Sequence, residues 1–295
     1  MSLITFLNNL RYLFRFDIKQ INLKASNSVS YEEINAILNN YRYELKDELA
    51  DLPVPKIKTA EETIEDLIKN KKSIARYGDG EFMAALGYDM AYQKVPPDMA
   101  KRLRDILVSN DENIYIGIAS IYFKSLKGIY PDAVKFIRSW WGARNQEKFL
   151  TLFDFNKQYY NTEFSQLYST YMEYDFEKHF NRMKKIWDKR DVTIIQGKGI
   201  RDNHEYDIFE NANSVNYQFG PTRDAYFEYD SILENALTIP KDNLVICILG
   251  PTATILAYDL AKHGYQALDL GHVSKDYEWY KQKKIKDGVD FYKLD

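Results

Sequence analysis

The chain has 295 residues, of which 45% are hydrophobic, so it can bury the core of one large domain, with or without a helical extension, and an intrinsically disordered chain is excluded. Its 40 basic and 43 acidic residues give a formal net charge of -3, which indicates no nucleic-acid partner and requires any anion site to be local. The single cysteine, Cys247, excludes an internal disulfide and a cysteine metal cluster, and its apolar neighbours indicate a core residue in a reducing compartment.

Residues 1–55 are predicted to form an N-terminal helical extension. Apolar residues recur at helical spacing in a first stretch and again between residues 31 and 49. Pro53 and Pro55 interrupt this pattern, so we place a domain boundary near residue 55 and expect a main domain over residues 56–295. The apolar positions of the first stretch are Leu3, Phe6, Leu7, Leu10, Phe14, Ile18 and Ile21.

Residues 1–25 also carry the basic side chains Arg11, Arg15, Lys19 and Lys24. A helix of this kind can lie in the headgroup layer of an anionic membrane, or it can pack on its own domain or on a second copy in a homodimer. No apolar run approaches the ~20 residues that span a bilayer, and the N-terminus lacks a small-residue cleavage pattern. We therefore expect a cytoplasmic protein, which membrane attachment would bring to the inner face of the plasma membrane.

Strand and helix patterns alternate after residue 55. Thr59, with Glu62 three residues later, predicts the start of a helix over residues 59–70. Short apolar segments predict strands, with helical patterns between most of them. This alternation favours an α/β fold in which helices cover both faces of a mainly parallel sheet. The predicted strands span residues 73–76, 114–118, 192–196, 214–217, 244–249 and 266–270.

The segment Asp79-Gly80-Glu81 lies where the strand of residues 73–76 gives way to a helix. Two carboxylates repel a diphosphate, but a divalent cation between them reverses that sign, and oxygen ligands favour Mg²⁺ or Mn²⁺. Gly80 permits a turn in which both carboxylates face one ion, whereas residues at i and i+2 of a helix point apart. The alternative is structural, with Asp79 as the helix cap and Glu81 as a favourable charge in the first turn.

The segment Gly197-Lys198-Gly199-Ile200-Arg201 follows the predicted strand of residues 192–196. Its glycines allow close approach of the backbone to a ligand, and Lys198 and Arg201 add positive charge where a phosphate can bind. An ordinary solvated loop explains the same residues equally well.

Residues 244–269 form the clearest unit of the sequence. An apolar strand ends before Gly250, a helix starts near Thr252, and a second strand ends at Asp269. In such a βαβ unit the helix N-terminus presents N–H groups that suit a phosphate, and an acidic residue ~20 positions on can contact a ribose hydroxyl. Only one glycine of the three-glycine dinucleotide fingerprint is present, so nucleotide binding and plain sheet packing both stay open.

His272, Asp276 and Glu278 follow the last predicted strand. His272 can ligate a metal or contact a phosphate, and either Asp276 or Glu278 can take a proton from an acceptor hydroxyl. A histidine at a strand end is also a common hydrogen-bonded loop residue. The sequence therefore offers two rival general bases and leaves the choice open.

Taken in order, these motifs resemble a bacterial family, the GT-D-type glycosyltransferases, first known as domain of unknown function 1792. The resemblance covers about residues 60–280, and the ordered set is specific although each piece alone is not. The segments that carry it are Arg76-Tyr-Gly-Asp-Gly-Glu81, Tyr92-Gln93 with the helix of residues 98–107, Gly197-Lys-Gly-Ile-Arg201 leading to Tyr206-Asp-Ile-Phe209, and residues 249–261 through Gly271-His272 to Tyr277-Glu278-Trp279.

The resemblance implies a Rossmann-like fold and transfer of a hexose, of glucose or galactose type, from a UDP-sugar. The implied acceptor is a growing surface polysaccharide or glycoprotein glycan, which includes a lipid-linked glycan. The resemblance also implies a Mn²⁺ or Mg²⁺ cofactor at Asp79 and Glu81 with His272 nearby, and a base at Glu278 or Asp276. The implied donor-binding residues are Arg76, Gly78, Gly197, Lys198, Arg201, Gly250, Thr252 and Asp269.

Two other functions fit parts of the sequence. A nicotinamide-dependent oxidoreductase would use the unit of residues 250–269 and leave Asp79-Gly80-Glu81 as a helix cap, but the glycine fingerprint is absent. A non-catalytic sugar-nucleotide-binding subunit of a glycan assembly complex would keep the fold and tolerate loss of the base. Binding of UDP, of NAD and of Mn²⁺ would distinguish the three.

Overall fold

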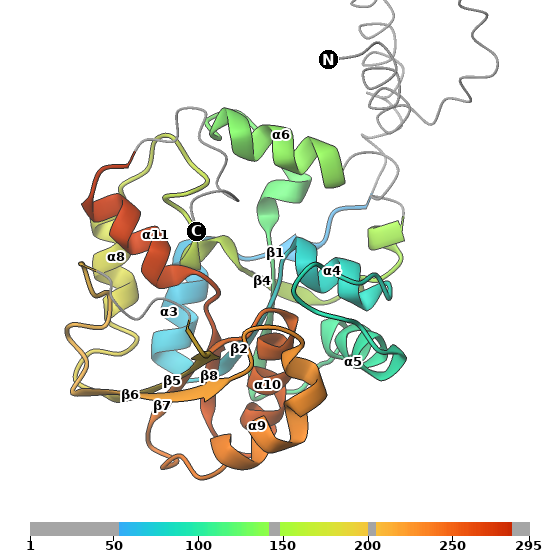
Figure 1. The fold of residues 1–295 in the computed structure, drawn as a ribbon. Helices are drawn as coiled ribbons and strands as arrows, with labels where there is room; N and C mark the ends of the chain where they lie inside the picture. Colours follow the sequence, from blue (N-terminus) through green and yellow to red (C-terminus); the bar gives the residue numbers. More distant parts are fainter. Residues whose placement is uncertain (1–52, 142–147, 200–204, 285–295) are drawn as a thin grey trace, which may run out of the picture. The chain divides into compact units, whose positions relative to one another are not determined.

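The computed structural model describes residues 53–141, 148–199 and 205–284 (Figure 1). The described residues divide into a larger unit, residues 55–134 and 152–284, and a smaller one that contains residues 135–141 and 148–151. Within the smaller unit the Trp141 and Phe149 rings stack with centroids 5.3 Å apart. The predictions for residues 1–52, including the helical extension and its membrane or dimer contact, lie outside the described residues.

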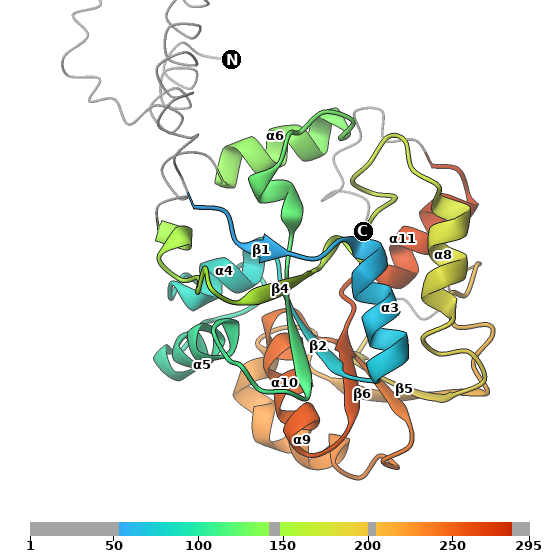
Figure 2. The same cartoon turned by 180° about the vertical axis from the view of Figure 1, so that it is seen from behind.

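The larger unit is built on one eight-stranded sheet with the order β1-β4-β3-β2-β8-β7-β5-β6 (Figures 1 and 2). Every strand pair in it is parallel, which confirms the predicted α/β fold with a parallel sheet. The strands are β1 Lys56–Ile57, β2 Ser73–Tyr77, β3 Ile114–Ile118, β4 Gln158–Asn161, β5 Asp191–Gly197, β6 Ser214–Gly220, β7 Leu244–Ile248 and β8 Gln266–Asp269.

Six of these strands were predicted from the sequence, and β1 and β4 were not. Five of the six carry apolar residues that are buried, which is the pattern expected of parallel strands covered on both faces, whereas β6 lies at the edge of the sheet and has no buried residue. β1 has two residues and β4 has four, and neither follows a recognisable strand–helix unit such as the one that marked the equally short β8.

Helices cover both faces of the sheet. Figures 1 and 2 show α3, α8 and α11 on one face and α4, α5, α9 and α10 on the other. The predicted start of α3 is confirmed, because Thr59 Oγ1 accepts from Glu62 N and a Glu62 carboxylate oxygen accepts from Thr59 N. The helices are α3 Ala60–Asn70, α4 Asp79–Ala85, α5 Pro97–Leu107, α6 Pro131–Trp140, α8 Phe176–Lys184, α9 Tyr229–Ala236, α10 Pro251–Lys262 and α11 Val273–Lys281, with short 3₁₀ turns at Ser120–Phe123, Glu163–Ser165 and Ala225–Glu228.

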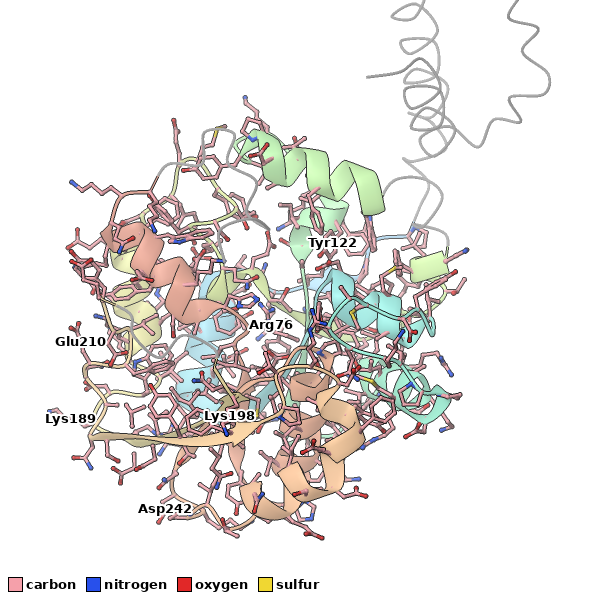
Figure 3. The ribbon with its side chains drawn as sticks, in the orientation of Figure 1. Arg76, Tyr122, Lys189, Lys198, Glu210 and Asp242 are labelled. Atoms are coloured by element: carbon pink, nitrogen blue, oxygen red, sulfur yellow. The ribbon has the colours of Figure 1, made fainter. Side chains whose placement is uncertain are left out.

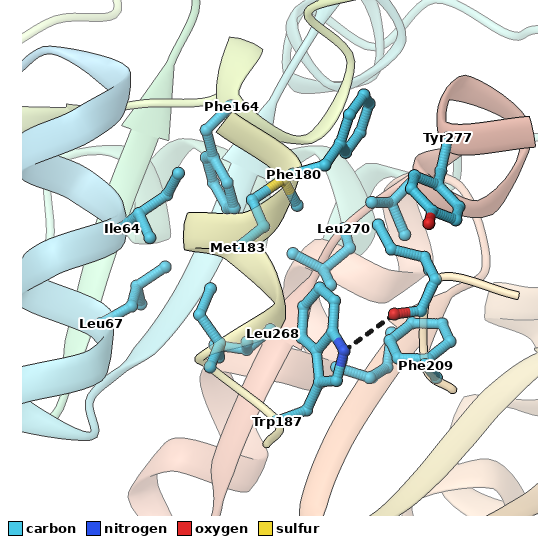
Figure 4. Close-up of a cluster of buried hydrophobic side chains, with 14 of the residues drawn as sticks. Ile64, Leu67, Phe164, Phe180, Met183, Trp187, Phe209, Leu268, Leu270 and Tyr277 are labelled. Atoms are coloured by element: carbon cyan, nitrogen blue, oxygen red, sulfur yellow. Dashed lines mark hydrogen bonds between the residues drawn. The ribbon is translucent and has the colours of Figure 1, made fainter. Parts of the chain in front are cut away.

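A core of buried side chains joins α3, α8 and α11 to the sheet (Figure 4). Trp187, which follows α8, is fully buried, and its indole N–H donates to the carbonyl of Ile208 at 3.0 Å. Leu268 of β8 and Tyr277 of α11 belong to the same cluster. This packing fixes β8 and the start of α11, and Cys247 in β7 is buried as predicted.

The strand order reverses next to β2. The chain continues from β2 to β3 on one side, whereas β8, the last strand, lies on the other side of β2. In open parallel sheets, ligands bind beyond the carboxyl ends of the strands at such a point of reversal. The fold therefore predicts a ligand site among the residues that follow β2, β8 and β7. No helix in the described part of the chain combines the length and the apolarity needed to cross a bilayer.

Candidate active site

Arg76, near the end of β2, is the centre of a charged cluster at the carboxyl edge of the sheet (Figure 3). Its Nη1 donates to Ser165 Oγ at 2.8 Å and lies 3.4 Å from the carbonyl oxygen of Thr162. Its Nε lies 3.6 Å from Asp269 Oδ1, and both side chains are largely buried. These contacts hold the guanidinium between the end of β2 and the end of β8.

Asp269, the last residue of β8, is 4% exposed and is held from several sides. Its Oδ2 lies 3.1 Å from Thr254 Oγ1, and its Oδ1 accepts from Gly271 N at 3.2 Å. Burial raises its pKa, and the charge of Arg76 opposes that rise. The contacts favour a role for Asp269 in orienting Arg76 over a direct contact with a ribose hydroxyl.

Glu81 lies in the first turn of α4 and is 9% exposed. One carboxylate oxygen accepts from Gly78 N at 2.8 Å, so Glu81 caps its own helix as a first-turn acid can. Burial, together with the negative charges of Asp269 and Asp79, raises its pKa to about 7 against the opposing effect of Arg76. Glu81 is therefore a carboxyl group whose ionisation a nearby cation would favour.

Asp79 is the first residue of α4, and the N-cap position belongs to Gly78. The structure thus differs from the turn that Gly80 suggested: residues two apart in a helix are rotated by ~200°, so the Asp79 and Glu81 side chains leave the axis in different directions. Asp79 faces solvent, yet it stands among closely packed atoms, and burial raises its pKa. Asp79 is exposed and Glu81 is buried, so the two carboxyl groups differ in their access to solvent.

The carboxyl groups fit a divalent cation by charge rather than as a complete ligand set. The positive charge of Arg76 opposes the rise in pKa of Asp79, of Glu81 and of Asp269, so this one guanidinium interacts electrostatically with three carboxyl groups. Among the described residues no three His, Cys, Asp or Glu side chains form a ready-made metal site. A Mg²⁺-type ion usually completes its shell with water and substrate phosphates, so one or two carboxylates suffice.

The helix α10 begins beside this cluster. Gly250 is its N-cap, with a φ of +55°, and Pro251 is its first residue. Thr252 is fully buried, and its Oγ1 lies 3.3 Å from Gln93 Oε1, so it contacts protein rather than the surface of the site. Thr254, one turn on, also lies 3.0 Å from the Arg76 carbonyl oxygen. Sequence reasoning missed Thr254, although it lies one helical turn beyond Gly250.

A second buried network adjoins the cluster and was not predicted. Glu163 accepts from Ser120 N at 2.9 Å, from Ser120 Oγ at 2.6 Å and from Tyr171 OH at 2.5 Å. The pKa of Tyr122 is raised well above its usual value by burial and by the charges of Asp79, Glu163 and Glu81. Tyr122, labelled in Figure 3, is therefore near the carboxyl groups of both networks. Glu163 follows β4, and recognition of that strand would have marked it as a carboxyl-end residue.

Gly197 and Lys198 lie at the end of β5, which β7 separates from β8. Lys198 is exposed (Figure 3), and its backbone N–H donates to Gly220 O at 2.8 Å. No hydrogen bond or ion pair joins Lys198 to the Arg76 cluster within the described ranges. Arg201 lies outside the described residues.

The three residues predicted near the acceptor are placed differently from one another. His272, the N-cap of α11, is exposed beyond the end of β8. Asp276 is buried, and its two oxygens accept from Tyr168 N at 2.9 Å and Ser169 N at 2.8 Å, which favours a role in anchoring that loop. Glu278 is half-buried, and its Oε1 accepts from the backbone N–H of residue 205 at 3.2 Å.

Gly271 provides a test of how tightly the cluster is packed. It has a φ of +52°, and a Cβ there would lie 2.6 Å from Arg76 Nη2. We expect Gly271→Ala to lower the free energy of unfolding by about 1 to 3 kcal/mol more than Gly264→Ala, since the latter site shares the positive φ but is open. Urea unfolding of both variants measures this. Equal losses would show that the guanidinium moves aside without cost.

The fold and this cluster define a class of protein, namely parallel α/β domains that have a charged ligand site at the carboxyl ends of the strands, where the strand order reverses. A protein-family model described as "Glycosyltransferase GT-D fold" matches residues 74–291. The chain therefore belongs to the GT-D glycosyltransferase family, and the resemblance predicted from its motifs is confirmed.

Curated relatives and solved structures agree with this family. The chain is 28% identical to "Probable glycosyl transferase Gly" of Streptococcus gordonii over 226 residues, and 28% identical to "Glycosyltransferase GlyD" of Streptococcus pneumoniae serotype 4 over 238 residues. These alignments include 75% and 78% of this chain but only 32% and 28% of the relatives, so the chain spans about a third of their length.

Two solved structures share the fold over most of their length. "A New Glycosyltransferase (DUF1792) from Streptococcus sanguinis" is 27% identical with a TM-score of 0.74, and the match covers 80% of this chain and 88% of that one. The structure described as "The highly conserved domain of unknown function 1792 has a distinct glycosyltransferase fold" is 30% identical with a TM-score of 0.74, covering 81% and 87%.

Proposed function

We propose that this chain transfers a hexose from a UDP-sugar to a glycan acceptor with the help of Mn²⁺ or Mg²⁺. The observation that carries the proposal is the buried Arg76–Asp269 ion pair at the point where the strand order reverses, with Asp79 and Glu81 near enough for the charge of Arg76 to oppose the rise in their pKa, in a chain of the GT-D family. A surface polysaccharide or a glycoprotein glycan, free or lipid-linked, is the acceptor that this family membership favours.

In this proposal the donor diphosphate lies over the turns after β2 and β7. Asp79 and the second oxygen of Glu81 would hold the cation, which would offset the charge that develops on the leaving nucleoside diphosphate. The exposed Gly250 at the N-cap of α10 would let a phosphate approach the positive end of the helix dipole. Arg76 is pinned by Ser165 and Asp269, so it would present a fixed positive charge to the same group.

On the acceptor side, Glu278 is the better general base of the two candidates. Asp276 is buried and both of its oxygens already accept a backbone hydrogen bond, so it is committed to holding the loop of residues 168–169 and is poorly placed to meet an acceptor hydroxyl. His272, exposed at the end of β8, would contact the metal or a phosphate. Arg201 remains a proposed donor contact.

Calorimetric titration with UDP, with and without Mn²⁺, tests the proposal. We expect UDP to bind tightly only with the metal, and we expect slow hydrolysis of UDP-glucose or UDP-galactose when no acceptor is present. Binding of NAD in place of UDP would instead support an oxidoreductase. UDP binding with no turnover of any UDP-hexose, even with glycan acceptors, would support a non-catalytic subunit.

A further inference from the structure

The segment of residues 89–95, between α4 and α5, is held rigidly against the neighbouring chain. Asp89 Oδ1 accepts from Val95 N at 2.8 Å and so closes the segment on itself. Asp224 pins it from outside: its N–H donates to Tyr92 O at 2.9 Å, and its Oδ1 accepts from Lys94 N at 2.6 Å. The backbone on both sides of the Tyr92 side chain is therefore fixed.

Gln93 ties the same segment to the start of α10. Its side chain is 2% exposed, and its Oε1 lies 3.3 Å from Thr252 Oγ1 and 3.4 Å from Tyr226 N. Its Nε2 donates to Lys94 O at 2.6 Å. A buried amide that is hydrogen-bonded through both its oxygen and its nitrogen favours one position of Tyr92 relative to the start of α10.

The Tyr92 ring bridges the two turns of the proposed donor site. A Cβ on Gly80 would lie 2.9 Å from Tyr92 OH, and a Cβ on Gly250 would lie 3.1 Å from Tyr92 Cε2. The hydroxyl thus reaches the turn that bears Asp79 and Glu81, and the ring edge reaches the N-cap of α10. Even so, Tyr92 is 45% exposed, so one part of this rigidly held ring faces solvent at the site.

We infer that Tyr92 is a donor-binding residue whose exposed ring packs on the nucleobase of the sugar nucleotide, an inference that rests on the proposed function. A diphosphate that spans the turns after β2 and β7 passes directly beside this ring. Of the groups attached to it, the planar base gains most from an aromatic face, since stacking operates over the whole ring. The rigid mounting means that little conformational entropy is lost on binding.

The inference is tested by calorimetry on the full chain with Tyr92→Ala and Tyr92→Phe. We expect Tyr92→Ala to weaken Mn²⁺-dependent UDP binding by about 5- to 100-fold, and Tyr92→Phe to keep it within about twofold. Tyr88→Ala is the matched control, because Tyr88 has a similar exposed fraction of 44% four residues away, and it should bind UDP as the wild type does. Circular dichroism and thermal unfolding establish that the variants fold.

Binding of inorganic pyrophosphate with Mn²⁺ distinguishes stacking on the nucleobase from a purely structural role of Tyr92, because pyrophosphate has no nucleobase. Tyr92→Ala should bind pyrophosphate as tightly as the wild type does. An equal loss for pyrophosphate and UDP would overturn the inference, because the ring would then act only as a spacer between the turns. Unchanged UDP affinity with weaker UDP-glucose binding would also overturn it and assign the ring to the sugar.

A panel of UDP, CDP, GDP and ADP distinguishes failure of this inference from failure of the proposed donor. If the wild type prefers another nucleoside diphosphate, the proposal that the donor is a UDP-sugar fails. A roughly 5- to 100-fold weaker binding of that nucleotide by Tyr92→Ala would still support the contact between Tyr92 and the nucleobase. Absence of binding to all four would overturn both.

Discussion

Glu81→Gln should lower the rate of hexose transfer at least ~100-fold while the protein remains folded. The substitution removes the negative charge proposed to hold the cation, and transition-state stabilisation by a metal is worth several kcal/mol. The glutamine carbonyl can still accept from Gly78 N, which Glu81 does at 2.8 Å, so the start of α4 is preserved. Initial rates with saturating Mn²⁺ and thermal unfolding give the two readouts.

Glu81→Ala is the companion variant, because it removes both the charge and the acceptor for Gly78 N–H. It should lose the same activity and, in addition, about 1 kcal/mol of stability through the lost cap. Full activity of Glu81→Gln in buffer treated with EDTA would contradict the metal assignment at this residue.

The pH dependence of the free energy of unfolding tests the raised pKa of Glu81 independently of activity. Its folded pKa of about 7 lies above the ordinary 4.5, so the folded protein binds a proton that the unfolded chain releases. The stability contributed by this proton is fully present below pH 4.5 and is lost as pH rises through 7. In EDTA, unfolding of the wild type relative to Glu81→Gln should therefore become easier over this range, by up to about 3 kcal/mol.

Arg76→Met should destabilise the protein by about 3 to 5 kcal/mol, because it leaves Asp269 buried without its cation. UDP binding should fall below detection, since the fixed positive charge proposed to meet the diphosphate is lost. Arg76→Lys keeps the charge but not the planar fork that reaches Ser165 and Asp269 together, so its effect should be intermediate. Urea unfolding and calorimetry measure the two effects.

The double variant Arg76→Met with Asp269→Asn separates an unpaired buried charge from lost packing. Because the second substitution removes the uncompensated carboxylate, stability should return in part while UDP binding stays lost. Strictly additive losses in the cycle would mean that the 3.6 Å pair contributes nothing and that Arg76 acts through its contact with Ser165.

The sequence by itself predicted the parts of the fold that local pattern controls. β3 and β7 are apolar runs of five residues between helical patterns, and the Thr59–Glu62 capping box marks the start of α3. The family followed from motifs in a fixed order, and the parallel sheet followed from the alternation of strands and helices. The spacing of apolar residues indicates burial only within one element, and a strand as short as β4 has too few residues to show such a spacing by itself.

Only the tertiary structure decided which candidate residues meet. Arg76 contacts Ser165, 89 positions away, and its carbonyl lies near Thr254, 178 positions away; neither partner carries a local signal. The sequence treated Asp276 and Glu278 as equivalent bases, yet the loop of residues 168–169 occupies both oxygens of Asp276. Such contacts depend on strand order and on the register between elements, and these are set by packing across the whole core rather than by any one segment.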